Sequence, residues 1–419
     1  MATPPRRRIT DSRVTRLLSV LTGMMAGSMA FSASLPVAKP EAAGMSSVRL
    51  ARIGAALNSD IERGLLPGAV VAVVRRGKLV YYESFGSVQK DSIFTIASMT
   101  KPLTASGALM LVEEGRILLN DPVGKYLPAL DKVVVAASGG GTEPAIRKPT
   151  IQDLMRHTAG FTYGNRGTND LYRNYPQSSG EVADAMSSDA FLARLAELPL
   201  FFQPGTRWDY SFGMDLLGLT VEAVSKQKLG EYLQARLFGP LGMADTGFNV
   251  PAEKAARVAR PLSKDPQTGK PQTFRDPVKP NRFDCGGGCA YSTAMDYARF
   301  AEMLRNRGNF EGTHFLGRKT VEYMTSDQLG PEVNVDRLRE FANMNGYGFG
   351  LSVAVRKGAG VSPIIGTAGD FNWGGANGTY FWVDPKEELS VVFMAAAPGE
   401  LRVHFRQLLT ALVLQAIAD

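Results

Sequence analysis

The sequence predicts an α+β fold, an α/β sandwich in which the two ends of the chain form one antiparallel sheet. Three observations support this prediction. Two strand-like runs joined by a short turn lie within residues 68–85, two more lie within residues 378–395, and the long segment between them has mostly helical spacing. Strands at both ends and helices in the middle indicate one sheet with flanking helices and an inserted, mostly helical domain.

The length and composition fit this architecture. A chain of 419 residues allows one large or two interlocked domains, and a hydrophobic content of 44% is typical of a globular protein. We expect residues 36–119 and 341–419 to form the sheet domain and residues 120–340 to form the helical domain.

Residues 1–33 are predicted to be a signal peptide. A basic start is followed by the apolar stretch Leu17–Phe31 and by small residues suited to cleavage. An uncleaved anchor or a disordered tail is the alternative, but the stretch is short and rich in Gly and Ser for a membrane span. We therefore expect an exported protein, periplasmic or secreted, with no stable membrane insertion once the signal is removed.

The net charge does not indicate a nucleic-acid partner. The formal charge is +7, but residues 1–32 hold five arginines against one aspartate, a net of +4, which leaves +3 for the rest of the chain. No basic stripe with interleaved aromatic residues accompanies that small excess.

The sheet domain is predicted to begin with a helix over Ser47–Arg63, capped by Ser46 or Ser47. Two strands follow, Gly68–Val74 and Leu79–Phe85.

Near the other end of the chain, Tyr347–Val355 is predicted to be a single strand. Gly378–Val383 and Leu389–Ala395 form a second predicted hairpin, and Glu400–Ile417 a final apolar helix.

Ser98 and Lys101 form a Ser-x-x-Lys pattern at the start of a predicted helix that ends at Gly115. A spacing of three places both side chains on one helix face, and the helix N-terminus favours developing negative charge. A serine hydroxyl becomes a good nucleophile when a neighbouring base takes its proton, and a lysine amine can be that base when burial favours its neutral form. The pair is therefore a candidate nucleophile and base.

The same pattern occurs three times, so its context has to decide between the copies. Ser225 and Lys228 lie near a predicted helix end, and Ser87 and Lys90 lie in a predicted turn. Only Ser98 has an apolar lead-in and a long apolar helix behind it, as a buried and pre-organised site requires.

The middle of the chain contains five predicted helices, at Ile151–Arg156, Asp189–Glu197, Phe212–Ser225, Leu229–Phe238 and Ala294–Arg305. Tyr163–Gly180 is polar and aromatic without a helical period, and either flanks a binding cleft or is an ordinary surface loop. Cys285 and Cys289 enclose three glycines. They either form a disulfide in an oxidising compartment or remain unpaired in a tight, buried turn.

Tyr210 stands between a loop and a helix, where its hydroxyl can meet Lys101 and relay a proton to and from Ser98. A tyrosine that only packs is the alternative.

Trp373, Gly374, Gly375 and Ala376 precede a predicted strand. Paired glycines let backbone approach a ligand closely, so an edge-strand N–H there can form half of an oxyanion hole with the Ser98 N–H. A β-bulge or a turn is the alternative.

Other chemistries lack their motifs. The chain has no Gly-x-Ser-x-Gly, no His-Glu-x-x-His and no phosphate-binding Gly-rich loop ending in Gly-Lys-Ser/Thr. We expect His157, His314 and His404 to be structural. Two cysteines without a neighbouring histidine do not make a zinc site, so we expect no metal and no cofactor.

In their order along the chain, these motifs resemble the serine β-lactamase and penicillin-binding superfamily, and most closely its class C-like carboxylesterases, known as family VIII. The Ser-x-x-Lys motif of the family matches Ser98 and Lys101, its Tyr-Ser motif matches Tyr210-Ser211, and its Trp-Gly-Gly motif matches Trp373-Gly-Gly. The resemblance runs from about Pro36 to the C-terminus and implies the β-lactamase/D,D-peptidase fold.

The resemblance also implies roles for the residues. Ser98 forms an acyl-enzyme, and Lys101 and Tyr210 share the general-base and general-acid duty. The oxyanion hole consists of the N–H groups of Ser98 and Ala376. The substrate-binding residues are Tyr163, Trp373, Gly374 and Gly375.

Two departures from the lactamase motifs favour esters. Phe212 stands where the lactamases have asparagine, and Trp373 stands where they have a cation that would hold a carboxylate. An apolar ring there suits a neutral acyl or alkoxy group.

The expected function is that of a serine carboxylesterase acting on short-chain neutral esters, with a small-molecule ester as its partner and an oligomeric state left open. The alternatives on the same fold are a weak β-lactamase, a D-amino acid amidase or peptidase, and an acyltransferase. The alternative of another class is a non-catalytic peptidoglycan- or penicillin-recognition protein, against which the intact Ser98, Lys101 and Tyr210 argue.

Overall fold

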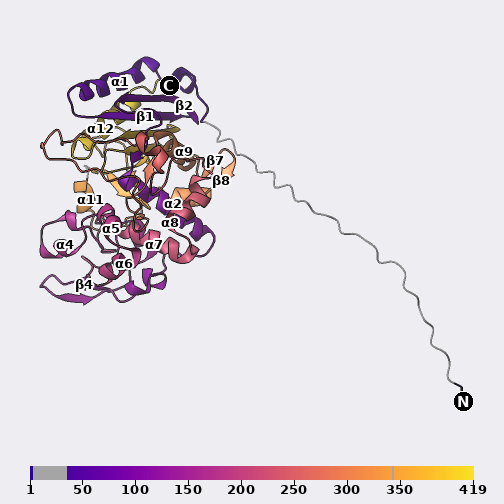
Figure 1. Cartoon of the computed structure of the whole chain (residues 1–419), viewed down its shortest axis with the longest axis vertical. Helices are drawn as coiled ribbons and strands as arrows, with labels where there is room; N and C mark the ends of the chain where they lie inside the picture. The colour runs from indigo at the N-terminus through magenta and orange to yellow at the C-terminus, as the bar shows by residue number, and fades with distance from the viewer. Residues whose placement is uncertain (3–34, 342–343) are drawn as a thin grey trace. The chain divides into compact units, whose positions relative to one another are not determined.

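A seven-stranded antiparallel sheet is built from both ends of the chain (Figure 1). The structure is a computed structural model that describes residues 1–2, 35–341 and 344–419. Apart from its first two residues, the predicted signal peptide at residues 1–33 lies outside the described residues.

The strand order is β2-β1-β13-β12-β11-β10-β9. The N-terminal hairpin of β1 (Gly68–Arg75) and β2 (Lys78–Gly86) pairs with β13 (Leu389–Ala395) near the C-terminus, with Ala69 opposite Ala395. The predicted α+β fold, with both chain ends in one antiparallel sheet, is confirmed.

Both faces of the sheet are covered by helices. Side chains alternate along a strand, so Ala69, Val71 and Val73 of β1 pack in one core with α1 (Ser47–Glu62) and α12 (Leu401–Leu414). The intervening β1 residues join the core that includes α2 (Thr100–Glu113) and α9 (Ala294–Arg305). In Figure 1, α1 and α9 lie on opposite sides of β1. Ser46 is the cap of α1, because its side chain accepts from the Arg49 N–H.

The five helices predicted in the middle of the chain are all present. They are α3 (Ile151–Met155), α6 (Ser188–Ala196), α7 (Gly213–Ser225), α8 (Leu229–Leu233) and α9, and α8 continues as one π-helical turn, Gln234–Phe238. α7 packs against α2 and α3. Although α9 falls within residues 120–340, it packs on the sheet strands β1, β12 and β13, and the division into two domains at these boundaries stays a prediction.

Four short helices were missed, namely α4 (Asp170–Asn174), α5 (Ser179–Ala185), α10 (Arg318–Met324) and α11 (Asp336–Glu340). The expectation that residues 163–180 contain no helix was wrong, because α4 lies there and α5 begins there. Both are too short to show a 3.6-residue period. Their caps were the available signal, since the side chains of Asn169 and Ser178 accept from the backbone three residues on.

Two predictions about the C-terminal strands were also wrong. Residues 347–355 form two strands, β9 (Tyr347–Phe349) and β10 (Ala354–Arg356), because the chain reverses through Ser352, whose φ is 76°. The segment with Trp373 is itself a strand, β11 (Phe371–Gly374), and it lies between β10 and β12 (Tyr380–Asp384), not at an edge.

The remaining strands form three short antiparallel pairs: β3 (Phe94–Thr95) with β6 (Tyr291–Ser292), β4 (Val134–Ala136) with β5 (Thr142–Pro144), and β7 (Asn309–Phe310) with β8 (Thr313–His314). In the part of the chain that the structure describes, none of the helices combines the length and the apolar character needed to cross a membrane.

Candidate active site

Ser98 lies in a single 3-10 turn, Ala97–Met99, between β3 and α2. Ala97 has a φ of 45°, a left-handed conformation that is costly for a residue with a side chain and is typical of functional sites. The turn is held by the Ile96 N–H, which donates to the Ala290 carbonyl at 3.0 Å. Ser98 therefore sits at the N-terminal end of α2, partly exposed, on a fixed backbone.

Lys101 is buried in the first turn of α2, with 1% of its surface exposed. Its Nζ lies 3.4 Å from the Ser98 Oγ and 3.4 Å from the Tyr163 hydroxyl. The same Nζ donates to the Gly287 carbonyl at 2.5 Å. The structure thus brings the predicted nucleophile and base together, and the hydrogen bond to Gly287 holds the lysine amine in place.

The loop that supplies this carbonyl is the Gly-rich segment between Cys285 and Cys289, which the structure joins in a disulfide. The Gly287 N–H donates to an Asp215 carboxylate oxygen at 3.0 Å, and the Gly286 carbonyl accepts from Thr104 of α2 at 2.9 Å. A segment of three glycines is conformationally free by itself, and here it is held on both sides of the peptide that binds the lysine.

Asp215 of α7 is the centre of a buried polar cluster beneath the pocket. Its Oδ2 accepts from the Ser179 hydroxyl at 2.8 Å and from the Tyr163 hydroxyl at 3.4 Å. Burial raises the pKa of the Asp215 carboxyl, and the nearby Lys101 cation opposes that rise. Burial also raises the pKa of Tyr163 well above its ordinary value, so its hydroxyl stays protonated.

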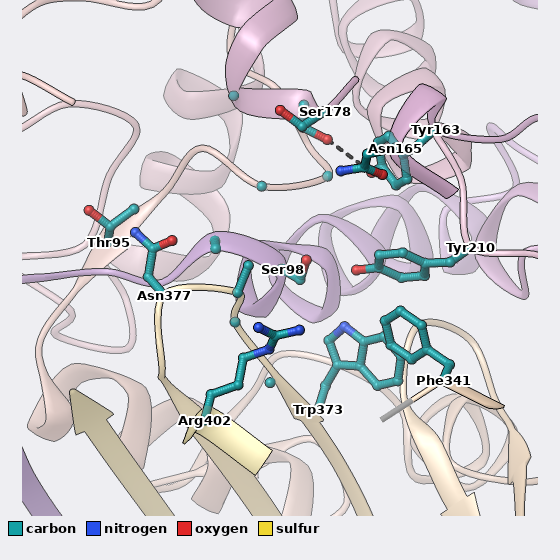
Figure 2. A pocket seen from close by; sticks show the side chains of 18 of the residues that line it. Thr95, Ser98, Tyr163, Asn165, Ser178, Tyr210, Phe341, Trp373, Asn377 and Arg402 are labelled. Carbon is teal, nitrogen blue, oxygen red and sulfur yellow. Dashed lines mark hydrogen bonds between the residues drawn. The ribbon is translucent and has the colours of Figure 1, made fainter. Parts of the chain in front are cut away.

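Tyr210 precedes α7, and its ring faces Lys101, whose Nζ lies 4.4 Å from the ring centroid. Figure 2 shows its hydroxyl pointing toward Ser98. Among the described residues this buried hydroxyl has no hydrogen-bond partner. An unpaired buried hydroxyl costs stability, so Tyr210 holds its position by packing and leaves its hydroxyl for another molecule.

His157 packs behind Tyr210, with 4.6 Å between the ring centroids, and its Nδ1 lies 3.2 Å from the Ser211 hydroxyl. Complete burial and the Lys101 cation lower the pKa of His157 well below its ordinary value, so the ring is neutral at neutral pH.

Trp373 lies at the end of β11 and is 1% exposed, stacked on Phe341 with 5.7 Å between ring centroids. Gly375 follows, and a Cβ at this position would lie 2.3 Å from the Ile96 carbonyl oxygen. The Thr379 hydroxyl also donates to that oxygen, at 3.2 Å. Only glycine allows this approach, which holds Ala376 beside the backbone that leads into Ser98.

These elements enclose a pocket of about 710 Å³. Ser98 and Tyr210 lie at its centre in Figure 2, with Trp373 and Phe341 on one side and Tyr163 with Asn165 on the other. All predicted site residues except Lys101 line it, namely Ser98, Tyr163, Tyr210, Trp373, Gly374, Gly375 and Ala376.

Sequence reasoning missed four residues that the structure places around the site: Ser179, Asp215, Gly287 and Arg406. Two of these residues stand out in the sequence. Asp215 is an acidic residue among the apolar residues at the start of its helix, and Gly287 is the centre of the Gly-rich turn. Arg406 of α12 carried no such signal, because a basic residue on a C-terminal helix normally faces solvent.

Comparison with known proteins identifies one family for this chain. A family model described as Beta-lactamase matches residues 53–415. Protein Rv1367c of Mycobacterium tuberculosis is 36% identical over 366 residues, which cover 83% of this chain and 90% of the relative. Esterase EstB of Burkholderia gladioli is 31% identical over 374 residues, which cover 82% of this chain and 89% of the relative.

Solved structures agree on the fold. EstCE1, described as a hydrolase with promiscuous acyltransferase activity, superposes with a TM-score of 0.73 over 87% of this chain and 98% of its own. The unliganded simvastatin synthase LovD of Aspergillus terreus superposes with a TM-score of 0.73 over 89% of this chain and 100% of its own. Both are 22% identical to this chain, so the likeness concerns the fold alone.

Proposed function

This chain belongs to the beta-lactamase family and is a serine hydrolase of the esterase type, and on that premise we propose that it hydrolyses short-chain neutral esters through an acyl-enzyme. The resemblance to the serine β-lactamase superfamily and its family VIII esterases is confirmed by the family match and by Esterase EstB. The observation that carries the proposal is the 3.4 Å separation of the Lys101 Nζ from the Oγ of Ser98, which lines the pocket.

In the first step, the Ser98 Oγ attacks the ester carbonyl carbon while its proton passes to Lys101 or Tyr210. The negative charge that develops on the carbonyl oxygen is held by the N–H groups of Ser98 and Ala376, and the N-terminal end of α2 favours that charge. The bond to the alcohol then breaks, and the alkoxide takes the proton as it leaves.

In the second step, a water molecule attacks the acyl carbon and gives its proton to the same pair. The bond to Ser98 breaks, its Oγ regains a proton, and the acid is released. The two aromatic rings of Trp373 and Phe341 beside the nucleophile favour an uncharged acyl or alkoxy group.

The first test replaces the nucleophile. Ser98→Ala is expected to lower kcat for 4-nitrophenyl butyrate by about 10⁴-fold or more, while the circular dichroism spectrum stays unchanged. Ser87→Ala and Ser225→Ala are matched controls, because each removes the serine of another Ser-x-x-Lys pattern, and both are expected to keep wild-type activity. Near-wild-type turnover by Ser98→Ala contradicts the assignment.

The second test separates reactions on the same fold. A panel of 4-nitrophenyl esters of increasing acyl length is assayed beside nitrocefin and a D-alanyl amide. We expect activity to be highest on short acyl chains and low on the β-lactam. A preference for nitrocefin, for the amide or for transfer to an added alcohol would identify one of the rival activities.

We also propose that the protein is exported. The basic and apolar composition of residues 1–33 supports this, and so does the disulfide between Cys285 and Cys289, since such bonds persist in oxidising compartments. Fractionation of cells that express the full chain is the test, and retention of the intact precursor in the cytoplasm contradicts the proposal.

A further inference from the structure

Arg406 of α12 is a half-buried cation beneath the loop that carries Ala376. Its Nη2 donates to the Gly375 carbonyl at 2.6 Å and to the Thr379 carbonyl at 3.3 Å. A Cβ on Gly374 would lie 2.4 Å from the Arg406 Cζ, so the guanidinium presses against the loop itself.

This cation has no carboxylate partner in the part of the chain that the structure describes. Within residues 35–341 and 344–419, no carboxylate forms an ion pair with Arg406, and its buried Nε has no hydrogen-bond partner. Burial and the neighbouring Arg402 lower the pKa of Arg406 to about 10, so the side chain is still charged at neutral pH. Holding an unpaired charge partly out of water is costly, which indicates that the positive charge serves the pocket that Arg406 lines.

The geometry of one peptide shows where that charge acts. The Gly375 carbonyl and the Ala376 N–H belong to the same planar, trans peptide group, so they point in opposite directions. By holding the carbonyl toward α12, Arg406 directs the N–H to the other side, where Ala376 and Ser98 line the pocket together.

We propose that Arg406 is a positioning residue of the oxyanion hole, which fixes the Gly375–Ala376 peptide and strengthens its N–H as a donor to the oxyanion formed at Ser98. Hydrogen bonds in a chain polarise one another, so a cation on the carbonyl makes the N–H of the same peptide a better donor. A pre-oriented donor of this kind stabilises the transition state more than the bound ester. The inference rests on the proposed esterase function.

The other reading of the same cation is a subsite for a substrate carboxylate, formed by Arg406 with Arg402. The two readings differ in what they predict. A positioning residue changes kcat for every ester, whereas a carboxylate subsite changes KM for anionic esters alone.

The experiment therefore uses two esters of similar size, 4-nitrophenyl butyrate and mono-(4-nitrophenyl) succinate. Arg406→Met is expected to lower kcat for both by about ten- to a hundredfold, less than the 10²–10³-fold loss that follows removal of an oxyanion donor itself, with KM within about twofold. Arg402→Met is the matched control, because this residue lies one turn earlier on α12, lines the same pocket and donates to the Gly399 carbonyl; we expect it to keep the wild-type kcat.

Arg406→Lys keeps the positive charge. We expect its fall in log kcat to be at most half of the fall that Arg406→Met shows. If Arg406→Met does not fold, Arg406→Lys is compared with Arg402→Lys. A kcat several-fold lower in Arg406→Lys alone, at unchanged KM, then supports the proposal.

Three results overturn the inference while the esterase function stands: a wild-type kcat in the Arg406 variants, an equal loss in the Arg402 variants, or a loss confined to the KM of the succinate ester. Full activity of Ser98→Ala overturns the esterase function and the inference together.

Discussion

The Nζ of Lys101 donates to the Gly287 carbonyl over 2.5 Å, a contact between residues that are 186 positions apart. This contact is shorter than the one between the same nitrogen and the Ser98 Oγ, at 3.4 Å. The Gly-rich loop therefore sets the direction of the lysine side chain, and the disulfide across that loop becomes part of the active site.

Removal of this disulfide is expected to slow catalysis. The double substitution Cys285→Ser and Cys289→Ser frees a loop of three glycines, so the Gly287 carbonyl holds Lys101 less firmly. We expect kcat for 4-nitrophenyl butyrate to fall about tenfold with little change in KM, and the chain-entropy model gives a stability loss of about 2 kcal/mol. Wild-type protein reduced with a dithiol should match the double variant, and an unchanged kcat in both contradicts the role of the loop.

The two tyrosines near Lys101 are expected to behave differently. Tyr210→Phe should lower kcat by about 10²–10⁴-fold, the usual contribution of a general acid or base, because its hydroxyl points toward Ser98. Tyr163→Phe removes one donor to Asp215, which keeps its bonds from Ser179 and Gly287. We expect that variant to lose about 1 kcal/mol of stability and less than about tenfold in kcat. A mild effect of Tyr210→Phe would reduce Tyr210 to a packing residue.

Gly375→Ala is expected to damage the active site although it adds only one methyl group. The new Cβ would meet the Ile96 carbonyl oxygen at 2.3 Å, so either the Ala376 loop or the backbone before Ser98 has to move. We expect kcat to fall by about 10²-fold, the loss associated with one misplaced oxyanion donor. Gly180→Ala is the matched control, because Gly180 lines the same pocket and a Cβ there meets no atom within 4 Å. Equal activity of the two variants argues against the close approach.

Asp296 on α9 gives the protein a pH-dependent stability. Burial raises the pKa of the Asp296 carboxyl to about 6, from its ordinary value of 3.8. Between these two values the folded state binds more protons than the unfolded state, so stability falls as the pH rises from about 4 to about 6. Asp296→Asn removes this dependence, and relative to that variant the wild type should lose up to about 3 kcal/mol across the interval. Urea unfolding at pH 4, 5, 6 and 7 measures the difference, and parallel curves for both proteins would contradict it.

Local pattern and its apolar context were sufficient for the nucleophile and for the two hairpins of the sheet. Ser98 and Lys101 are three residues apart, so their spacing alone predicts their proximity, and the continuous apolar run of residues 68–74 predicts a buried strand. The strand with Trp373 was missed because it has only four residues and ends in glycines, which weaken a strand pattern.

The groups that hold the active-site residues in place could not be predicted from local sequence, for a different reason. The Gly287 carbonyl and the Arg406 guanidinium reach the site through backbone contacts, and any residue type can supply a carbonyl. Only the pairing of distant elements brings such groups together.

The pairing of β1 with β13 has a consequence for the order of events in folding. The N-terminal hairpin has its inner neighbour in β13, the last strand along the chain, so the sheet closes only after β13 has been synthesised. Contacts of such long sequence separation fold slowly. Ala376 and Arg406 flank β13 in the sequence, so the proposed oxyanion hole forms late in synthesis, together with the closed sheet.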